Sequence, residues 1–171
     1  AGDTLIRNEF LSVHQVYDRI EALAGTENWR IPKGMVKKLS LLLQSISVEY
    51  VETSFAHGDF TPWNMQYDKN GKLYIYDWEL AKNNMPIGFD IFHFIFQKSI
   101  LIEHKNWAQI QNEIQNVFNR FKFKSSTPVQ EQLKLYLLVN TVQQLEIFAQ
   151  QNQWHTQVEW LLNTWNEAIS D

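Results

Sequence analysis

Residues 57–64 read His-Gly-Asp-Phe-Thr-Pro-Trp-Asn, so a carboxylate and an amide, those of Asp59 and Asn64, share one short segment. Asp77 follows thirteen residues later, directly after the apolar stretch 73–76. A carboxylate within hydrogen-bond reach of a hydroxyl can take its proton, and carboxylate and amide oxygens are the hard ligands that Mg²⁺ prefers. This spacing fits phosphoryl transfer to an alcohol, with Asp59 as base and Asn64 and Asp77 as metal ligands.

The elements before this segment are predicted to be two helices. Apolar residues recur at helical spacing over residues 5–24, and Gly25 is placed to end that helix in a left-handed conformation. A second apolar face runs over residues 36–46, with Pro32 tolerated in the first turn. We expect this second helix to lead directly into residues 57–64.

A β-hairpin is predicted to follow, with strands over residues 65–67 and 72–76. The four residues between them end in Asn70-Gly71, a pair that accepts positive φ and closes hairpins, and Asp68 is interpreted as a turn residue. Paired strands lie about 5 Å apart. The hairpin would therefore bring its two ends, Asn64 and Asp77, together in space.

The rest of the chain is predicted to be helical. Residues 88–103 are apolar nearly all round, as expected of a helix buried in the middle of a domain. Further helical patterns cover residues 107–121, 129–150 and 154–165, and a polar break lies at 124–128. The expected fold class is mainly α with a small β-hairpin (α+β), as a single domain over residues 1–171.

The composition excludes several classes of protein. The chain of 171 residues is 44% apolar and carries a net charge of -4 without a Lys/Arg run, which argues against a nucleic-acid surface. With no cysteine, disulfides and thiolate metal sites are excluded. No apolar run approaches the roughly 20 residues of a membrane span, and no signal peptide is evident. We expect a cytoplasmic protein that binds neither nucleic acid nor membrane.

These residues resemble the motifs of the aminoglycoside phosphotransferase and choline kinase superfamily, which shares the protein-kinase-like fold. The likeness covers residues 33–103 and rests on His57 to Asn64, Asp77-Trp78-Glu79 and Gly88-Phe89-Asp90-Ile91. It implies that Asp59 is the catalytic base and that Asn64 and Asp77 bind Mg²⁺ and, through it, ATP. It also implies that Asp90 is a structural acid that steadies the catalytic loop by hydrogen bonds.

The resemblance favours a small-molecule acceptor over a protein. Gly58 stands where many protein kinases have an arginine, and no Ala-Pro-Glu sequence follows Asp77. Relatives phosphorylate aminoglycosides, choline, ethanolamine, sugars and homoserine. The helical acceptor region, residues 88–171, carries no decisive code for one of them, and the acidic total mildly favours a cationic acceptor.

Neighbouring residues have alternative interpretations. His57 is interpreted as a packed residue that orients the loop, and His93 as a core histidine outside the site. Trp63 and Trp78 either stack on a substrate or serve as packing elements. Glu79 either holds a magnesium-bound water, contacts a cationic acceptor or faces solvent.

A large element of such kinases is missing. Kinases of this fold place a glycine-rich loop and a strand lysine before the catalytic loop. The 56 residues before His57 show neither, and Gly25 and Gly34 are isolated. We expect a C-terminal lobe that is inactive alone, with an incomplete ATP site and the missing N-terminal lobe of the same protein as partner. The start at Ala1 suggests an excised segment or a processed product.

Two other functions stay open. One is a degenerate kinase-like lobe that acts as a non-catalytic binding module. The other is a metal-dependent hydrolase, which would need more ligands than the sequence offers.

Overall fold

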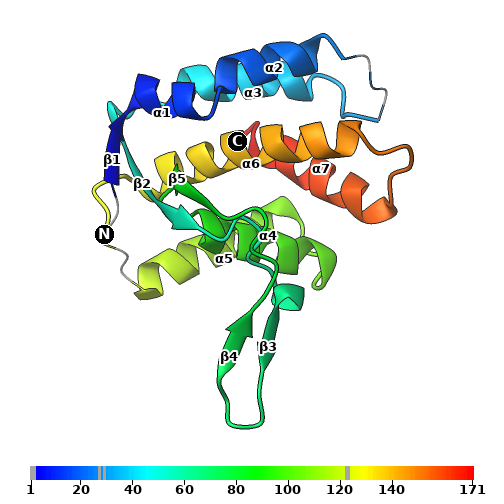
Figure 1. Ribbon diagram of the computed structural model, residues 1–171. Helices are drawn as coiled ribbons and strands as arrows, with labels where there is room; N and C mark the ends of the chain where they lie inside the picture. Colours follow the sequence, from blue (N-terminus) through cyan, green and yellow to red (C-terminus); the bar gives the residue numbers. More distant parts are fainter. Residues whose placement is uncertain (1–2, 27, 29, 122–123) are drawn as a thin grey trace.

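Seven α-helices and two small antiparallel sheets make up the residues that the computed structural model describes, 3–26, 28, 30–121 and 124–171 (Figure 1). The helices are α1 (Arg7–Val13), α2 (Val16–Ala24), α3 (Met35–Ser45), α4 (Phe89–Leu101), α5 (Trp107–Phe121), α6 (Val129–Ala149) and α7 (Thr156–Ala168). The strands are β1 (Asp3–Ile6), β2 (Tyr50–Ala56), β3 (Met65–Tyr67), β4 (Leu73–Ile75) and β5 (Lys82–Pro86). The fold is thus mixed, with more helix than strand.

The N-terminal segment differs from the single helix predicted over residues 5–24. Strand β1 is followed by α1 and α2, which are separated at Gln15, a residue with φ 49°. Gly25 ends α2 with φ −77°, so the left-handed cap predicted there is wrong. Gly34, directly before α3, does have a left-handed conformation, with φ 80°. Pro32 precedes it and lies outside the helix.

Strand β2 lies between α3 and residues 57–64, so the prediction that the helix leads directly into that segment is wrong. The strand is the middle of a three-stranded antiparallel sheet, β1-β2-β5. Its buried face carries Val51 and Thr53, whereas Phe55 is exposed. The register shifts between Ser54 and Ala56, so that Phe55 is exposed and Ala56 is buried, and the strand lacks the regular alternation from which a strand is predicted.

Strand β5 lies between the predicted hairpin and the predicted helix over residues 88–103, where no element was predicted, and its Lys82 pairs with Ala56 of β2. Residues 57–81 therefore leave the sheet and return to it at neighbouring positions. The sheet holds the two ends of this segment in place.

The predicted hairpin is confirmed, with Met65 paired to Ile75 across β3 and β4. The Asp68 carboxylate accepts hydrogen bonds from the backbone N–H groups of Asn70 (2.8 Å) and Lys72 (2.9 Å). Gly71 has φ 79°, whereas Asn70 is not among the residues with positive φ. The hairpin extends away from the helices in Figure 1.

Helix α4 packs against α5, α6 and α7, as predicted for the apolar segment 88–103. Its buried aromatic residues meet those of neighbouring helices: Phe92 stacks on Phe118 at 4.8 Å between ring centroids, and Phe96 on Tyr136 at 5.5 Å. Burial of each aromatic side chain stabilises the folded state by about 1.5–3 kcal/mol relative to leaving it exposed. This packing sets the position of α4, whose first two turns face the segment 57–64.

The later helices agree with the predicted ranges, except that Trp154 precedes α7 and packs partly buried against the core. Within the described part of the chain, none of the helices combines the length and apolarity needed to cross a bilayer.

Candidate functional site

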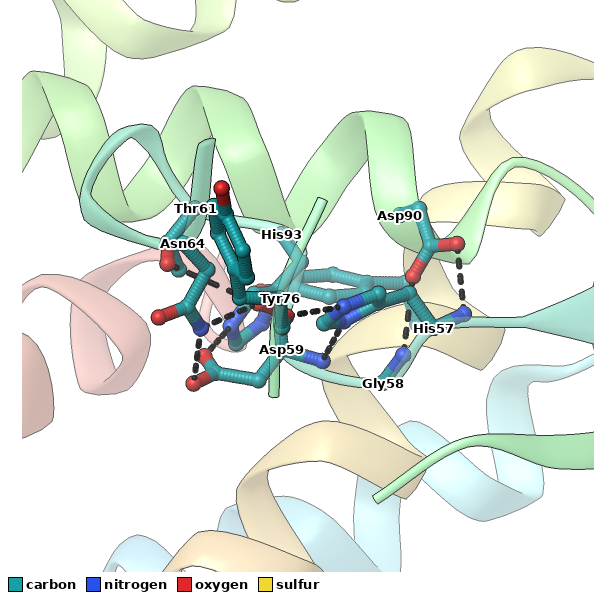
Figure 2. A network of polar contacts seen from close by, with 9 residues as sticks. His57, Gly58, Asp59, Thr61, Asn64, Tyr76, Asp90 and His93 are labelled. Carbon is teal, nitrogen blue, oxygen red and sulfur yellow. Dashed lines mark hydrogen bonds and ion pairs between the residues drawn. The ribbon is translucent and has the colours of Figure 1, made fainter. Parts of the chain in front are cut away.

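The start of the segment 57–64 is attached to α4 through Asp90. Its carboxylate accepts hydrogen bonds from the backbone N–H of His57, at 2.8 Å, and of Gly58, at 3.0 Å (Figure 2). Asp90 lies in the first turn of α4, where the helix dipole also favours a negative charge. These two bonds to a charged acceptor hold the backbone at the point where it turns away from the sheet.

Gly58 is required by the space around it. It has φ 85°, and a Cβ atom placed there would lie 2.3 Å from the carbonyl oxygen of Leu80. No side chain fits that distance, and the left-handed backbone is itself unfavourable for other residues. Because residues 58 and 80 lie this close, the two ends of the segment 57–81 are held together.

His57 is buried, and both of its ring nitrogens have partners. Nε2 lies 2.8 Å from the carbonyl oxygen of Tyr76, and Nδ1 accepts the backbone N–H of Asp59 at 3.3 Å. Because a carbonyl oxygen can only accept, Nε2 is the donor of this bond, whereas Nδ1 is an acceptor. His57 thus links the loop to the far end of the hairpin, and neither nitrogen is available to a substrate.

Asp59 and Asn64 contact each other directly. A short 3₁₀ turn, Pro62–Asn64, brings Asn64 back, so that its amide nitrogen donates to the backbone oxygen and to Oδ2 of Asp59, both at 2.9 Å (Figure 2). The amide oxygen of Asn64 accepts no hydrogen bond within the residues described here. The side chain therefore orients the carboxylate with one end and leaves the other end available as a ligand.

His93 also contacts Asp59, although sequence analysis placed it outside the site. The side chain is buried, as predicted, and its Nε2 lies 3.1 Å from Oδ1 of Asp59. The hydrogen bond from His93 lowers the pKa of Asp59 below its usual value, against the effect of partial burial, and Asn64 adds to the lowering. A clue was present in the sequence, because His93 follows Asp90 by three residues and so lies on the same helix face.

Asp77 lies beside Asn64 across the base of the hairpin, because the backbone N–H of Tyr76 donates to the carbonyl oxygen of Asn64 at 2.9 Å. Asp77 is exposed and has φ 63°. Left-handed conformations are uncommon outside glycine, and such strain concentrates at functional sites.

The other predicted residues surround this centre less closely. Trp78 lies against His57, with 4.4 Å between ring centroids, stacks on Phe55 at 6.2 Å and donates its indole N–H to Ile75 at 2.9 Å. Trp78 therefore packs against neighbouring side chains, although about half of its surface stays exposed to solvent. Trp63 and Glu79 are exposed.

Two oxygen-bearing groups of the kind that bind Mg²⁺ lie at the base of the hairpin: the amide oxygen of Asn64, which accepts no hydrogen bond within the described residues, and the exposed carboxylate of Asp77. Mg²⁺ commonly takes only one or two protein oxygens and completes its shell with water and phosphate. No group of three or more His, Cys, Asp or Glu residues gathers as a metal site within the described ranges. The pair suits a metal that arrives with a nucleotide better than an ion held by protein alone.

Comparisons with protein-family models, curated proteins and solved structures found no match to this chain.

Proposed function

We propose that this chain is the catalytic and acceptor-binding lobe of an ATP-dependent phosphotransferase that acts on a hydroxyl of a small molecule. The observation that carries the proposal is the arrangement of Asp59, Asn64 and Asp77. One carboxylate is oriented by two donors, and beside it an amide oxygen and a second carboxylate lie free for a metal.

In the proposed reaction, Asp59 accepts a hydrogen bond from the acceptor hydroxyl and orients its oxygen towards the γ-phosphorus. The new O–P bond forms as the bond from the γ-phosphorus to its bridging oxygen breaks, ADP leaves, and the hydroxyl proton passes to the Asp59 carboxylate. The low pKa of Asp59 keeps it ionised near neutral pH and so ready to accept.

Asn64 and Asp77 would hold Mg²⁺ through one oxygen each. When bound, the ion supplies positive charge against the phosphates. Asp90 and His57 act on the backbone of the loop, because their hydrogen bonds keep Asp59 and Tyr76 in place. Trp63, Trp78 and Glu79 remain the candidates for contact with the acceptor, since all three side chains are exposed on this part of the chain.

The nucleotide-binding part of this enzyme is proposed to be a lobe outside these 171 residues. The described elements before residue 57 are β1, α1, α2, α3 and β2, and their turns carry no glycine-rich loop. The hairpin supports the same proposal. Two-stranded hairpins are marginally stable alone, yet this one exposes Tyr67 and Leu73 on one face and Tyr74 on the other. A lobe packed on it would cover these side chains.

The two other functions have less support. A metal-dependent hydrolase needs a larger ligand set, and the described residues hold no cluster of three or more His, Cys, Asp or Glu side chains. A degenerate binding module would not need an Asp59 carboxylate that is oriented by two hydrogen-bond donors beside an amide oxygen that is free to bind a metal.

The test measures transfer of labelled γ-phosphate from ATP, with Mg²⁺, to a panel of hydroxyl compounds that includes aminoglycosides, choline and sugars. It is run on this chain and on the longest product of its gene. We expect transfer with the longer product and little with the chain alone. A longer product that keeps all three residues, yet neither binds nor turns over ATP, would overturn the proposal.

A further inference from the structure

Two buried polar side chains lie behind the Asp59 carboxylate and connect it to the core. His93 on α4 and Tyr136 on α6 are both fully buried. His93 Nε2 lies 3.1 Å from Oδ1 of Asp59, and His93 Nδ1 lies 3.4 Å from the hydroxyl oxygen of Tyr136. The three residues join the loop, the central helix and the longest helix, which are distant in sequence.

The direction of these hydrogen bonds follows from the chemistry of the two end groups. A carboxylate has only acceptor oxygens, and Oδ2 of Asp59 already accepts from Asn64, so Oδ1 is the acceptor of the bond from His93. Burial raises the pKa of Tyr136 well above its usual value, so its hydroxyl keeps the proton and can donate. Tyr136 therefore donates to Nδ1 of His93, and Nε2 carries the proton that is donated to Asp59.

The ring of His93 is held from its sides as well as at its nitrogens. Phe89, one turn earlier on α4, stacks nearly parallel to it at 6.0 Å between centroids and 8° between planes. Tyr136 meets it edge-on at 6.3 Å. A flip of the ring would break the hydrogen bonds at both of its nitrogens, so Asp59 and Tyr136 together favour this orientation of the ring and its Nε2–H tautomer.

The two oxygens of Asp59 have separate donors. Oδ2 accepts from Asn64 at 2.9 Å, and Oδ1 accepts from His93. One donor alone leaves a carboxylate free to rotate about it, whereas two donors on opposite oxygens select one rotamer. Hydrogen-bond donors that are themselves held in place keep a reacting group in its productive orientation.

We propose that His93 is the positioning residue of Asp59, and that Tyr136 acts through His93 by selecting its Nε2–H tautomer. The role of Asp59 as a base rests on the proposed function. The hydrogen bonds from Tyr136 to His93 and from His93 to Asp59 do not depend on it, so the two are tested separately.

The first experiment uses the 171-residue chain without substrate. Long-range ¹H–¹⁵N spectra of its histidines report the tautomer, and three-bond couplings of the Asp59 Hβ protons report its χ1 rotamer. We expect wild-type His93 to carry its proton on Nε2 and Asp59 to hold one rotamer. Tyr136→Phe should give His93 mixed tautomers, and Tyr17→Phe, at an exposed tyrosine of α2, should change nothing. A protonated Nδ1 in the wild type would overturn the proposal.

Two substitutions separate positioning from packing. Leu in place of His93 fills space but donates no hydrogen bond, whereas Gln carries an amide N–H at about the reach of Nε2. We expect averaged rotamers of Asp59 in His93→Leu and a single rotamer in His93→Gln. If both variants are folded and keep a single rotamer, His93 does not position the carboxylate.

Phosphotransfer by the longer product adds a second readout. There, His93→Leu should lower kcat about 10–100-fold, as is typical for loss of an outer-shell partner, with the KM for ATP little changed. His93→Gln should recover most of the loss. Equal losses of kcat in both variants would contradict positioning, whereas a wild type without any transfer would contradict the proposed function and leave the rotamer test to decide on His93.

Discussion

The amide of Asn64 donates to both the backbone oxygen and the carboxylate of Asp59, at 2.9 Å each. The same side chain thus closes the loop, orients the proposed base and turns its own oxygen outwards. This relationship explains why the two residues need a five-residue spacing, because the 3₁₀ turn at Pro62 must reverse the chain between them.

Loss of the Asp59 carboxylate should abolish most phosphotransfer in the longer protein that we propose. Asp59→Ala is expected to lower kcat by about 10²–10⁴-fold, the usual contribution of a general base. The fold should persist, since the core around α4 does not depend on this carboxylate. Steady-state kinetics with circular dichroism checks both, and Glu167→Gln on the exposed face of α7 is the control. Equal kcat in Asp59→Ala and wild type would remove the assigned role.

Asp77 should affect nucleotide binding more than the chemical step. Asp77→Ala is expected to weaken binding of Mg-ATP at least about tenfold, because one charged contact contributes about 1.5–3 kcal/mol. Asn tolerates the φ of 63° and keeps one oxygen. Asp77→Asn therefore separates the loss of charge from backbone strain. Titration calorimetry in Mg²⁺ measures the affinities, and unchanged binding in both variants would exclude Asp77 as a ligand.

Two glycines give a matched test of the close approach at the loop. Gly58 and Gly71 have φ of 85° and 79°, but a Cβ at Gly58 meets Leu80 whereas nothing lies within 4 Å at Gly71. Both Ala variants pay a similar backbone cost, about 1–2 kcal/mol. Gly58→Ala should lose a further 1–3 kcal/mol or so through the clash. Urea denaturation of both variants decides, and similar losses would mean that residue 80 moves aside freely.

A closed set of four ion pairs should make stability depend on pH. Lys98 and Lys105 each contact both Glu103 and Glu113, at 2.6–3.0 Å. Burial acts to raise the pKa of Glu113, but hydrogen bonds from Lys105, Lys98 and Ser99 outweigh it, so this pKa lies below its usual value. A depressed carboxyl pKa stabilises the fold above the unfolded-state pKa, and this contribution is lost as pH falls through the folded-state pKa.

Glu113→Gln should therefore be less stable than wild type at neutral pH, and the difference should shrink as the medium is acidified below the usual carboxyl pKa. Added salt should reduce it too, because the pairs are partly exposed. Urea denaturation across a pH series measures the free energy of unfolding, with Glu167→Gln as the control. A difference that stays constant into acid would contradict the assignment.

Local chemistry made the hairpin and the later helices predictable. The Asp68 to Gly71 turn uses side-chain and backbone preferences of four neighbouring residues, and α5 and α6 follow their apolar periodicity. The prediction of a single N-terminal helix was wrong because the chain leaves the helical conformation at Gln15, whose positive φ is not favoured by its residue type. Strands β2 and β5 were not predicted because each depends on a partner strand that is distant in sequence.

Spacing and turn preference lie within a short window of chain, so the candidate residues Asp59, Asn64 and Asp77 and the hairpin that joins two of them could be predicted without a structure. The contact of His93 with Asp59 across 34 residues of sequence, with Tyr136 behind it, could not be predicted in this way. That contact depends on where the core holds α4 against α6, and such packing is a property of the whole fold.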